Sequence, residues 1–256
     1  PAPDVTISVI AGDFVGPSLL SSLDAGRGMV DCLNAVGIMY ASLGNHEDDI
    51  PVTELHARVA EFRGTWLSTN VDFDRAMPRD AVVEVGDRRV GLVAVVDDDR
   101  TVYRREPFGG APMRSARTDA LAAAADLRAR GCATVVAITH QDMPRDRELA
   151  RTGAFPLIVG GHEHVAIVEN MDGTWIAKAG ADGVAAIVSD LTWNGDGPPT
   201  VSVERVKSDG YSEDLEVRAR VDGHMEKVHQ LADATLVQAQ VGEALLSSIG
   251  TRARQT

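Results

Sequence analysis

Residues 39–47 read MYASLGNHE, a largely apolar run that ends in a glycine and three polar residues. The run over 39–43 predicts a short buried strand, which the glycine closes. Residues 5–13, VTISVIAGD, repeat the arrangement, with a β-branched apolar run followed directly by Gly12 and Asp13. In open α/β sheets, ligands bind in the crevice outside the carboxyl ends of the strands. The polar residues after these two runs are therefore candidates for one common site.

Two later runs end in the same way. Residues 133–138 predict a β-branched strand that is followed by Thr139 and His140. Residues 157–159 predict a short strand that ends in GGHEH, residues 160–164. The four endings together offer a carboxylate, an amide oxygen and several imidazoles, which are metal-ligand groups. The glycines before them remove side-chain bulk and allow sharp exits from the strands.

The last ending carries two histidines, His162 and His164. They are two residues apart, so on a continuing strand they would point to opposite faces. Gly160 and Gly161 allow the chain to leave strand geometry, so that both rings can reach one site. Two imidazoles on one turn suit two adjacent metal ions better than one, and the two oxygens of Asp13 allow it to bridge them.

Each ending taken alone has a simpler interpretation. Asp13 could cap the turn after its strand. Asn45 and His46 could form an ordinary turn, and His140 could be a core histidine with satisfied hydrogen bonds. The two histidines of GHEH are the hardest to explain without a metal, because two buried neutral imidazoles would each need hydrogen-bond partners. A further acidic run, residues 97–99 (DDD), is interpreted as a solvated loop rather than as additional ligands.

The rest of the pattern predicts an α/β protein, because helices and strands alternate in its first part, as is typical of a largely parallel sheet. Later hairpins add antiparallel strands. The helices are expected over residues 19–36, 53–62 and 115–130, the hairpins over 81–96 and 166–179, and two further strands over 184–193 and 200–206. From about residue 212 the pattern is charged and helical.

Composition limits the classes of function. The chain has 256 residues, 44% of them hydrophobic, which suffices for one large core. Its formal net charge of −13, without a basic stripe, argues against nucleic-acid binding. The same charge would repel a small phosphate ester unless metal ions invert the local field. No apolar run approaches the roughly 20 residues that span a bilayer, so we expect no membrane partner and a cytoplasmic location. The sequence begins at Pro1, which leaves open secretion behind a removed leader.

The motifs GD (12–13), GNHE (44–47), TH (139–140) and GHEH (161–164), in this order, resemble those of the calcineurin-like metallophosphoesterases. Residues 12–47, GDFVGPSLLSSLDAGRGMVDCLNAVGIMYASLGNHE, resemble more narrowly the 5′-nucleotidase and UDP-sugar hydrolase branch. The resemblance covers roughly residues 5–191. The set of motifs is specific, whereas any one of them alone would be weak.

The resemblance implies a four-layer αββα sandwich of two mixed β-sheets flanked by helices. It also implies a dinuclear centre of two divalent metal ions, which these ligand types do not identify as zinc, manganese or iron. Asp13 would bridge the two ions. Asn45, His140 and His162 would complete one metal site. His164 would belong to the other.

By the same resemblance, His46 would act near the leaving-group oxygen, as a general acid or by stabilising charge. Glu47 would be the acidic partner that orients this histidine. A metal-bound hydroxide would attack phosphorus in line, and the metal ions would stabilise the equatorial oxygens.

The sequence also departs from the family pattern. The family's first motif, Asp-x-His on an earlier strand, supplies two more ligands, and only four residues precede Val5. We therefore expect the N-terminal strand of the sandwich to be missing. Residues 252–256, RARQT, resemble the opening of the second domain of 5′-nucleotidases. We accordingly expect a catalytic domain over 1–207 and a helical segment over 208–256 that links it to that second domain.

The resulting hypothesis is metal-dependent hydrolysis of a small phosphate monoester, with 5′-nucleotides as the leading substrate class. Two alternatives stay open. One is a phosphodiesterase or pyrophosphatase that acts on cyclic nucleotides or nucleotide sugars. The other is a non-catalytic pseudoenzyme, because two expected metal ligands are not among these residues.

Overall fold

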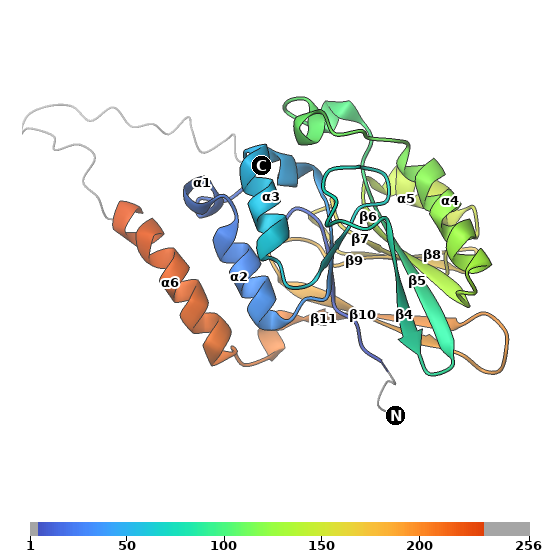
Figure 1. Ribbon diagram of the computed structural model, residues 1–256. Helices are drawn as coiled ribbons and strands as arrows, with labels where there is room; N and C mark the ends of the chain where they lie inside the picture. Colours follow the sequence, from blue (N-terminus) through green and yellow to red (C-terminus); the bar gives the residue numbers. More distant parts are fainter. Residues whose placement is uncertain (1–4, 233–256) are drawn as a thin grey trace, which may run out of the picture.

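Six strands form the central sheet of the computed structural model, which describes residues 5–232 (Figure 1). Their order is β4-β5-β6-β7-β9-β8. The four inner strands run parallel: β5 (Arg88–Val96), β6 (Thr134–His140), β7 (Leu157–Gly160) and β9 (Thr174–Lys178). The edge strands β4 (Asp80–Val85) and β8 (Ile167–Met171) pair antiparallel with β5 and β9. Both predicted hairpins are therefore confirmed, and the sheet is mixed as expected.

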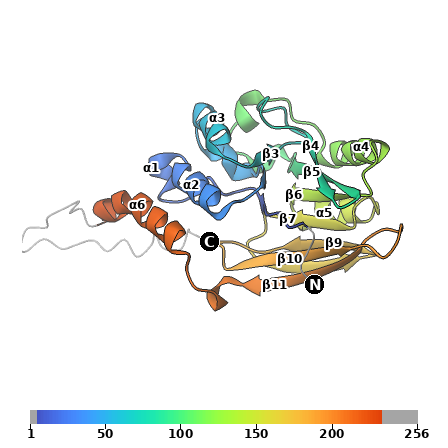
Figure 2. The same ribbon diagram turned by 60° about the horizontal axis from the view of Figure 1, so that its bottom comes forward.

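Two smaller sheets form the layer that faces this one. The parallel strands β1 (Val9–Ala11), β2 (Tyr40–Ser42) and β3 (Thr65–Leu67) make one, and the antiparallel hairpin β10 (Ala185–Thr192) and β11 (Thr200–Lys207) makes the other. One apolar cluster joins all three sheets; it includes Leu67, Leu92, Ile138 and the half-buried Ile187. Figure 2 shows β10 and β11 lying along β9. Within residues 5–232, no ladder joins β1 to β10, so this layer consists of two sheets rather than one.

Helices cover the outer face of each layer. The α2 (Arg27–Val36) and α3 (Val52–Glu61) helices pack with β1–β3, whereas α4 (Ala116–Ala129) and α5 (Met143–Ala150) pack on the six-stranded sheet. The α4 helix begins after Ser115, whose hydroxyl accepts a hydrogen bond from the Thr118 N–H. Residues 5–232 also contain four 3-10 helices: η1 (Asn45–Asp49), η2 (Arg100–Val102), η3 (Pro107–Gly110) and η4 (Ser208–Gly210). The expected αββα layering is confirmed.

The prediction of a single helix over residues 19–36 is wrong. The chain instead forms α1 (Ser21–Asp24) and α2, separated by two residues with positive φ, Ala25 (53°) and Gly26 (80°). Gly26 is needed because a Cβ at this position would lie 2.6 Å from Cβ of Val15. The buried Arg58 fixes the break by donating hydrogen bonds to the carbonyls of Asp24 and Ala25. Tertiary contacts therefore end the first helix where periodicity alone would continue it.

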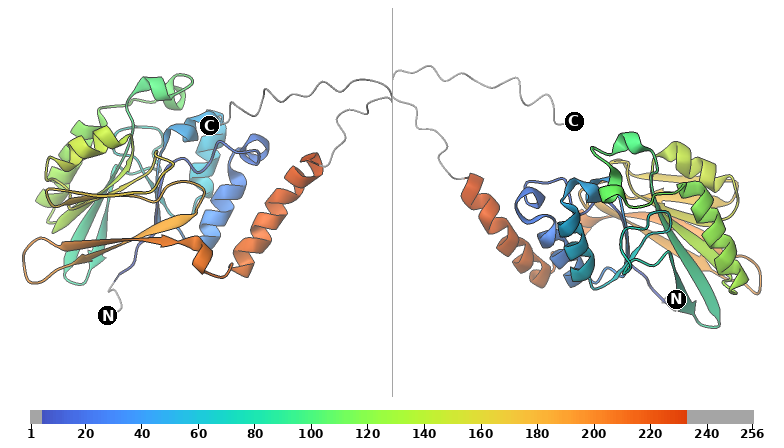
Figure 3. Two further views of the ribbon diagram at one scale, coloured as in Figure 1. Left: turned by 180° about the vertical axis from the view of Figure 1, so that it is seen from behind. Right: turned by 45° about the horizontal axis from the view of Figure 1, so that its top comes forward.

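The last described helix, α6 (Leu215–Ala232), lies along α2 (Figure 3). Asp31 of α2 joins the two helices, because its carboxylate contacts Arg220 at 2.8 Å and His224 at 3.0 Å. The RARQT segment lies outside the described residues, and the division at 207/208 stays a prediction. Among residues 5–232, no helix has both the length and the apolar character that crossing a membrane requires.

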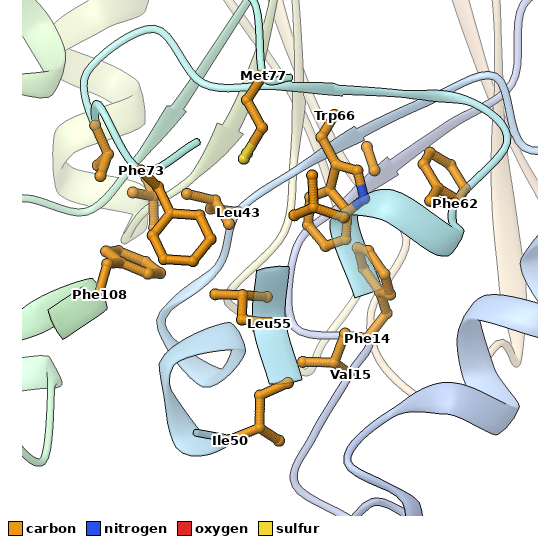
Figure 4. Packing of buried hydrophobic residues seen from close by; sticks show 14 of the residues in the cluster. Phe14, Val15, Leu43, Ile50, Leu55, Phe62, Trp66, Phe73, Met77 and Phe108 are labelled. Carbon is orange, nitrogen blue, oxygen red and sulfur yellow. The ribbon is translucent and has the colours of Figure 1, made fainter. Parts of the chain in front are cut away.

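Apolar residues that closely follow β1 and β2 are part of a hydrophobic core (Figure 4). Phe14, directly after Asp13, packs on Trp66 with ring centroids 4.8 Å apart. Leu43, directly before the GNHE segment, is 2% exposed within the same cluster. The polar residues of both turns are therefore adjacent to buried apolar residues, which limits how far the polar side chains can move.

Candidate metal centre

Three of the predicted ligands lie together where strands of the two facing layers end. Asp13 follows β1, His140 is the last residue of β6, and His162 follows β7. Each offers one ligand atom, and these atoms all lie within 4.8 Å of one another. The strand endings that look separate in the sequence therefore converge for these three residues, as their positions predicted.

His140 provides the clearest test of whether the site suits a cation. Its Nδ1 lies 2.6 Å from the carbonyl oxygen of Ala11, which can only accept, so Nδ1 carries a proton. Its Nε2 is buried and lies 3.0 Å from Oδ2 of Asp13, with no other hydrogen-bond partner. Burial disfavours a charged ring, but the Asp13 carboxylate raises the pKa of His140 above its ordinary value, so the pair suits a shared cation, either a proton on Nε2 or a metal ion. The pair thus fits a metal site.

Asn45 extends this set of ligands. Its Oδ1 lies 3.2 Å from Nδ1 of His162. Two ligands about 2.1 Å from one ion, at tetrahedral or octahedral angles, lie roughly 3.0–3.4 Å apart. Both this distance and the 3.0 Å between His140 and Asp13 fall in that range. Each of these two pairs therefore has a spacing that two ligands of one ion can have.

The protonation of two of these residues also suits a metal. Burial favours the neutral form of Asp13, but the His140 ring and the His46 N–H together lower the pKa of this carboxyl below its ordinary value. Burial, aided by the neighbouring His140 ring, lowers the pKa of His162. An ionised carboxylate and a neutral imidazole are the forms that bind a metal ion.

Two glycines let the strand ends approach this closely. A Cβ on Gly12 would lie 2.6 Å from both the Gly44 nitrogen and Nδ1 of His140. A Cβ on Gly161 would lie 2.8 Å from the same ring nitrogen. The glycines noted before the polar residues therefore allow close packing of backbone against the His140 ring, in addition to sharp exits from the strands.

Glu47 does not orient His46, so the role that the resemblance implied for it is corrected. Its side chain is fully buried, and its two oxygens accept hydrogen bonds from backbone N–H groups. The four donors are Asp13, Phe14, Val15 and Gly44, at 2.7, 2.8, 3.2 and 2.5 Å. Glu47 therefore ties the turn after β1 to the turn after β2, and it holds the backbone of Asp13 in place.

Asp49 occupies the position expected for Glu47. Its Oδ2 lies 2.7 Å from Nδ1 of His46. In the 3-10 helix η1, side chains at i and i+3 eclipse each other, so residue 49 lies beside residue 46 while residue 47 points into the core. The His46 side chain is 27% exposed, and its backbone N–H donates to Oδ1 of Asp13 at 2.8 Å. The His46 backbone therefore contacts the ligand cluster, and its partly exposed ring has one nitrogen engaged by Asp49.

His164 is placed differently from the other ligands. It is exposed and does not belong to the cluster of Asp13, His140 and His162. Its assignment to a second metal ion stays a prediction.

The acidic run 97–99 is also not a solvated loop, so that interpretation is wrong. Asp97 is fully buried and pairs with Arg145 at 3.2 Å. Asp98 accepts from the N–H of Ala116 at 3.0 Å. Asp99 accepts from backbone N–H of Thr101 and caps η2. Each carboxylate thus has a partner within the fold. For Asp97 and Asp98 this partner is distant in the sequence, so the position at a strand end could not reveal it.

Sequence reasoning missed a buried charged group behind the GHEH turn. Lys178, the last residue of β9, is fully buried and pairs with Asp146 at 2.7 Å and with Glu163. The one available signal is a lysine that ends an apolar strand, TWIAK, which by itself resembles an ordinary strand terminus.

Comparisons with known proteins place the fold. No protein-family model matches the chain, and no curated protein sequence matches it either. Among solved structures, the chain is similar to the sulfate thiohydrolase SoxB of Thermus thermophilus, with 24% identity and a TM-score of 0.79 over 90% of this chain and 44% of that one. It is similar to a 5′-nucleotidase precursor from the same species, with 22% identity and a TM-score of 0.78 over 91% and 51% of the two chains.

A third similar structure is the calcineurin-like phosphoesterase YfkN of Bacillus subtilis, with 16% identity and a TM-score of 0.70 over 88% of this chain and 83% of that one. The chain has the calcineurin-like phosphoesterase fold, in the form shared with 5′-nucleotidases. The family resemblance inferred from the motifs is thereby confirmed at the level of the fold. The chain spans about half the length of the first two structures, 44% and 51%.

Proposed function

We propose that this protein hydrolyses phosphate monoesters with the aid of two divalent metal ions, and that 5′-nucleotides are its leading substrate class. The observation that carries the proposal is the convergence of Asp13, His140 and His162, whose ligand atoms all lie within 4.8 Å of one another. The fold shared with 5′-nucleotidases supports the substrate class. The overall charge of −13 also suits a site in which bound cations, rather than the protein surface, attract the phosphate.

The ligands divide between the two ions as follows. Asn45, His140 and His162 would hold one ion, Asp13 would be shared with the second, and His164 would serve the second. When bound, the ions supply Lewis acidity to the phosphoryl oxygens and lower the pKa of an attacking water. Manganese, zinc and iron all suit this mixed set of oxygen and nitrogen ligands.

His46 serves the leaving group. Asp49 holds its Nδ1, so Nε2 is the atom that can donate a proton or a hydrogen bond to the leaving ester oxygen. The hydrogen bond from the His46 N–H to Asp13 keeps this ring in register with the ligand cluster.

Metal analysis combined with a phosphatase assay tests the proposal. We expect the purified protein, after incubation with manganese, to hold about two ions per chain and to hydrolyse p-nitrophenyl phosphate and adenosine monophosphate. Less than about one ion per chain, with neither substrate hydrolysed, would contradict the proposal and favour a pseudoenzyme. Faster hydrolysis of a cyclic nucleotide or a nucleotide sugar than of the monophosphate would instead favour the diesterase or pyrophosphatase alternative.

A further inference from the structure

The turn that presents His162 has a backbone conformation that needs external support. His162 has a φ of 78°, in the left-handed region that residues other than glycine rarely adopt. Such a conformation persists only when surrounding contacts over-determine it. On its N-terminal side, the Gly161 N–H donates to the Thr139 carbonyl at 2.8 Å. On its C-terminal side, the contacts are made by Glu163.

Glu163 attaches the turn to two separate elements. Its Oε1 accepts a hydrogen bond of 2.6 Å from the N–H of Met143, in the first turn of α5. Its Oε2 pairs with Nζ of Lys178 at the end of β9. The residue next to a candidate ligand is therefore fixed at both oxygens, by a helix on one side and a strand on the other.

The surroundings of Lys178 are built to hold a buried ammonium group. Its side chain is fully buried, and its Nζ also contacts Oδ2 of Asp146 and the carbonyl oxygen of Gln141, both at 2.7 Å. Gly160 leaves room for its stem, because a Cβ there would lie 2.7 Å from Cε of Lys178. A buried ammonium is retained only where such partners compensate its desolvation.

We propose that Glu163 and Lys178 are positioning residues of the metal centre. They clamp the turn after β7 to α5 and β9, which aims the His162 ring at Asp13 and His140 and thereby sets the affinity for the metal ion. The inference rests on the metal centre of the proposed function, but not on its substrate or on turnover. Among residues 5–232, the side-chain hydrogen bonds and ion pairs of Glu163 and Lys178 go to Met143, Gln141, Asp146 and each other, so the clamp holds the turn rather than binding the ligands directly.

A nearby ion pair offers a matched control for a purely structural role. Arg147 of the same α5 helix pairs with Glu169 of β8 at 2.7 Å, and its Nε and Nη2 both donate to the carboxylate. Like Glu163, Glu169 therefore ties α5 to the sheet. Its strand carries none of the candidate ligands.

The test measures manganese affinity by isothermal titration calorimetry on the full chain, together with the melting temperature of each variant. We expect Glu163→Ala to weaken manganese binding by about 10- to 100-fold, the usual effect of losing a group that orients a ligand. Glu163→Gln keeps the acceptor for Met143 and leaves Lys178 paired with Asp146, so we expect it to bind within a few-fold of the wild type. Glu169→Ala should lower the melting temperature without changing the affinity.

A folded Glu163→Ala variant that binds manganese as tightly as the wild type would overturn the inference. Equal losses of affinity in Glu163→Ala and Glu169→Ala would also overturn it, since the effect would then be one of general stability. Lys178→Met leaves the carboxylates of Asp146 and Glu163 without their cation. If this variant does not fold, the Glu163 variants still decide whether the clamp sets the metal affinity. A wild type that binds manganese but hydrolyses nothing contradicts the proposed function alone, whereas a wild type that binds no manganese contradicts both.

Discussion

Two turns of this protein present a histidine followed by a glutamate, and the two glutamates brace their turns in different ways. Glu47, after β2, is fully buried and accepts four backbone N–H groups without any cation. Glu163, after β7, has a side chain that is 21% exposed, accepts a single N–H and pairs with Lys178. Similar sequence neighbourhoods therefore stabilise a site either through the backbone or through an ion pair.

The difference follows from what each turn must hold. Glu47 in the turn after β2 must hold two chain segments together, residues 13–15 and Gly44, so it accepts hydrogen bonds from the N–H groups of both. The turn after β7 must hold one strained residue, His162, against a helix and a neighbouring strand. Backbone donors bind a carboxylate locally and rigidly, while a lysine reaches across a strand. We expect the first brace to matter more for folding and the second more for metal affinity.

The largest effect is expected for Glu47→Ala. Four buried N–H groups would lose their acceptor, and each orphaned donor costs about 1–3 kcal/mol, so the free energy of unfolding should fall by more than about 4 kcal/mol. Urea denaturation followed by circular dichroism measures this. In Glu163→Ala only the Met143 N–H is orphaned, and we expect a loss of about 1–3 kcal/mol. Equal losses would show that the two braces do not differ in the way proposed.

His46→Ala separates catalysis from coordination at the first turn. If His46 acts as a general acid, hydrolysis of adenosine monophosphate should slow by about 10²- to 10⁴-fold while metal content stays unchanged. Steady-state kinetics and elemental analysis of the same sample check both statements. Loss of metal in this variant would instead place His46 among the ligands.

His162→Ala removes a proposed ligand from the second turn. Metal affinity should fall by more than about 100-fold, beyond the usual effect of a group that only orients a ligand, and the rate should fall with it. His56, whose side chain is 43% exposed on α3, provides the control, because His56→Ala should change neither quantity. Activity that survives with unchanged metal content would show that His162 is not a ligand.

Asp49→Asn should give the smallest effect. The variant keeps the shape of the side chain beside His46 but removes its negative charge. A hydrogen bond to a charged group contributes about 1.5 kcal/mol more than one to a neutral group, so we expect the rate to fall about tenfold. The loss should be greater for adenosine monophosphate than for p-nitrophenyl phosphate, whose leaving group needs no proton. The same loss for both substrates would mean that Asp49 supports the structure of η1 rather than the departure of the leaving group.

The strand endings were predictable because strand and turn signals are local. Apolar runs closed by glycine, with metal-ligand residues directly after them, suffice to place Asp13, Asn45, His140 and His162 at strand ends. Parallel strands bring the ends within one sheet to the same edge, which groups Asp13 with Asn45 and His140 with His162. The two pairs meet because the two sheets face each other, which the alternation of strands and helices does not show. The hairpins and the α/β class follow from the same local signals.

The assignments that failed depended on contacts between distant segments. Periodicity cannot show that Gly26 must pack on Val15, so the break between α1 and α2 was missed. A resemblance cannot show that η1 turns Glu47 inward and places Asp49 beside His46. On a 3-10 helix residues 46 and 49 share a face, whereas residue 47 lies on a different one.

Local patterns were enough to specify the fold class, the order of the strand endings and the candidate ligand residues, because each depends on neighbours within a few positions. The partner of each buried charge depends instead on how distant segments pack, which placed Asp49 beside His46 and Lys178 beside Glu163. A buried charge is satisfied by whichever partner the packing brings within reach. That partner lies 15 residues from Glu163 and on another strand.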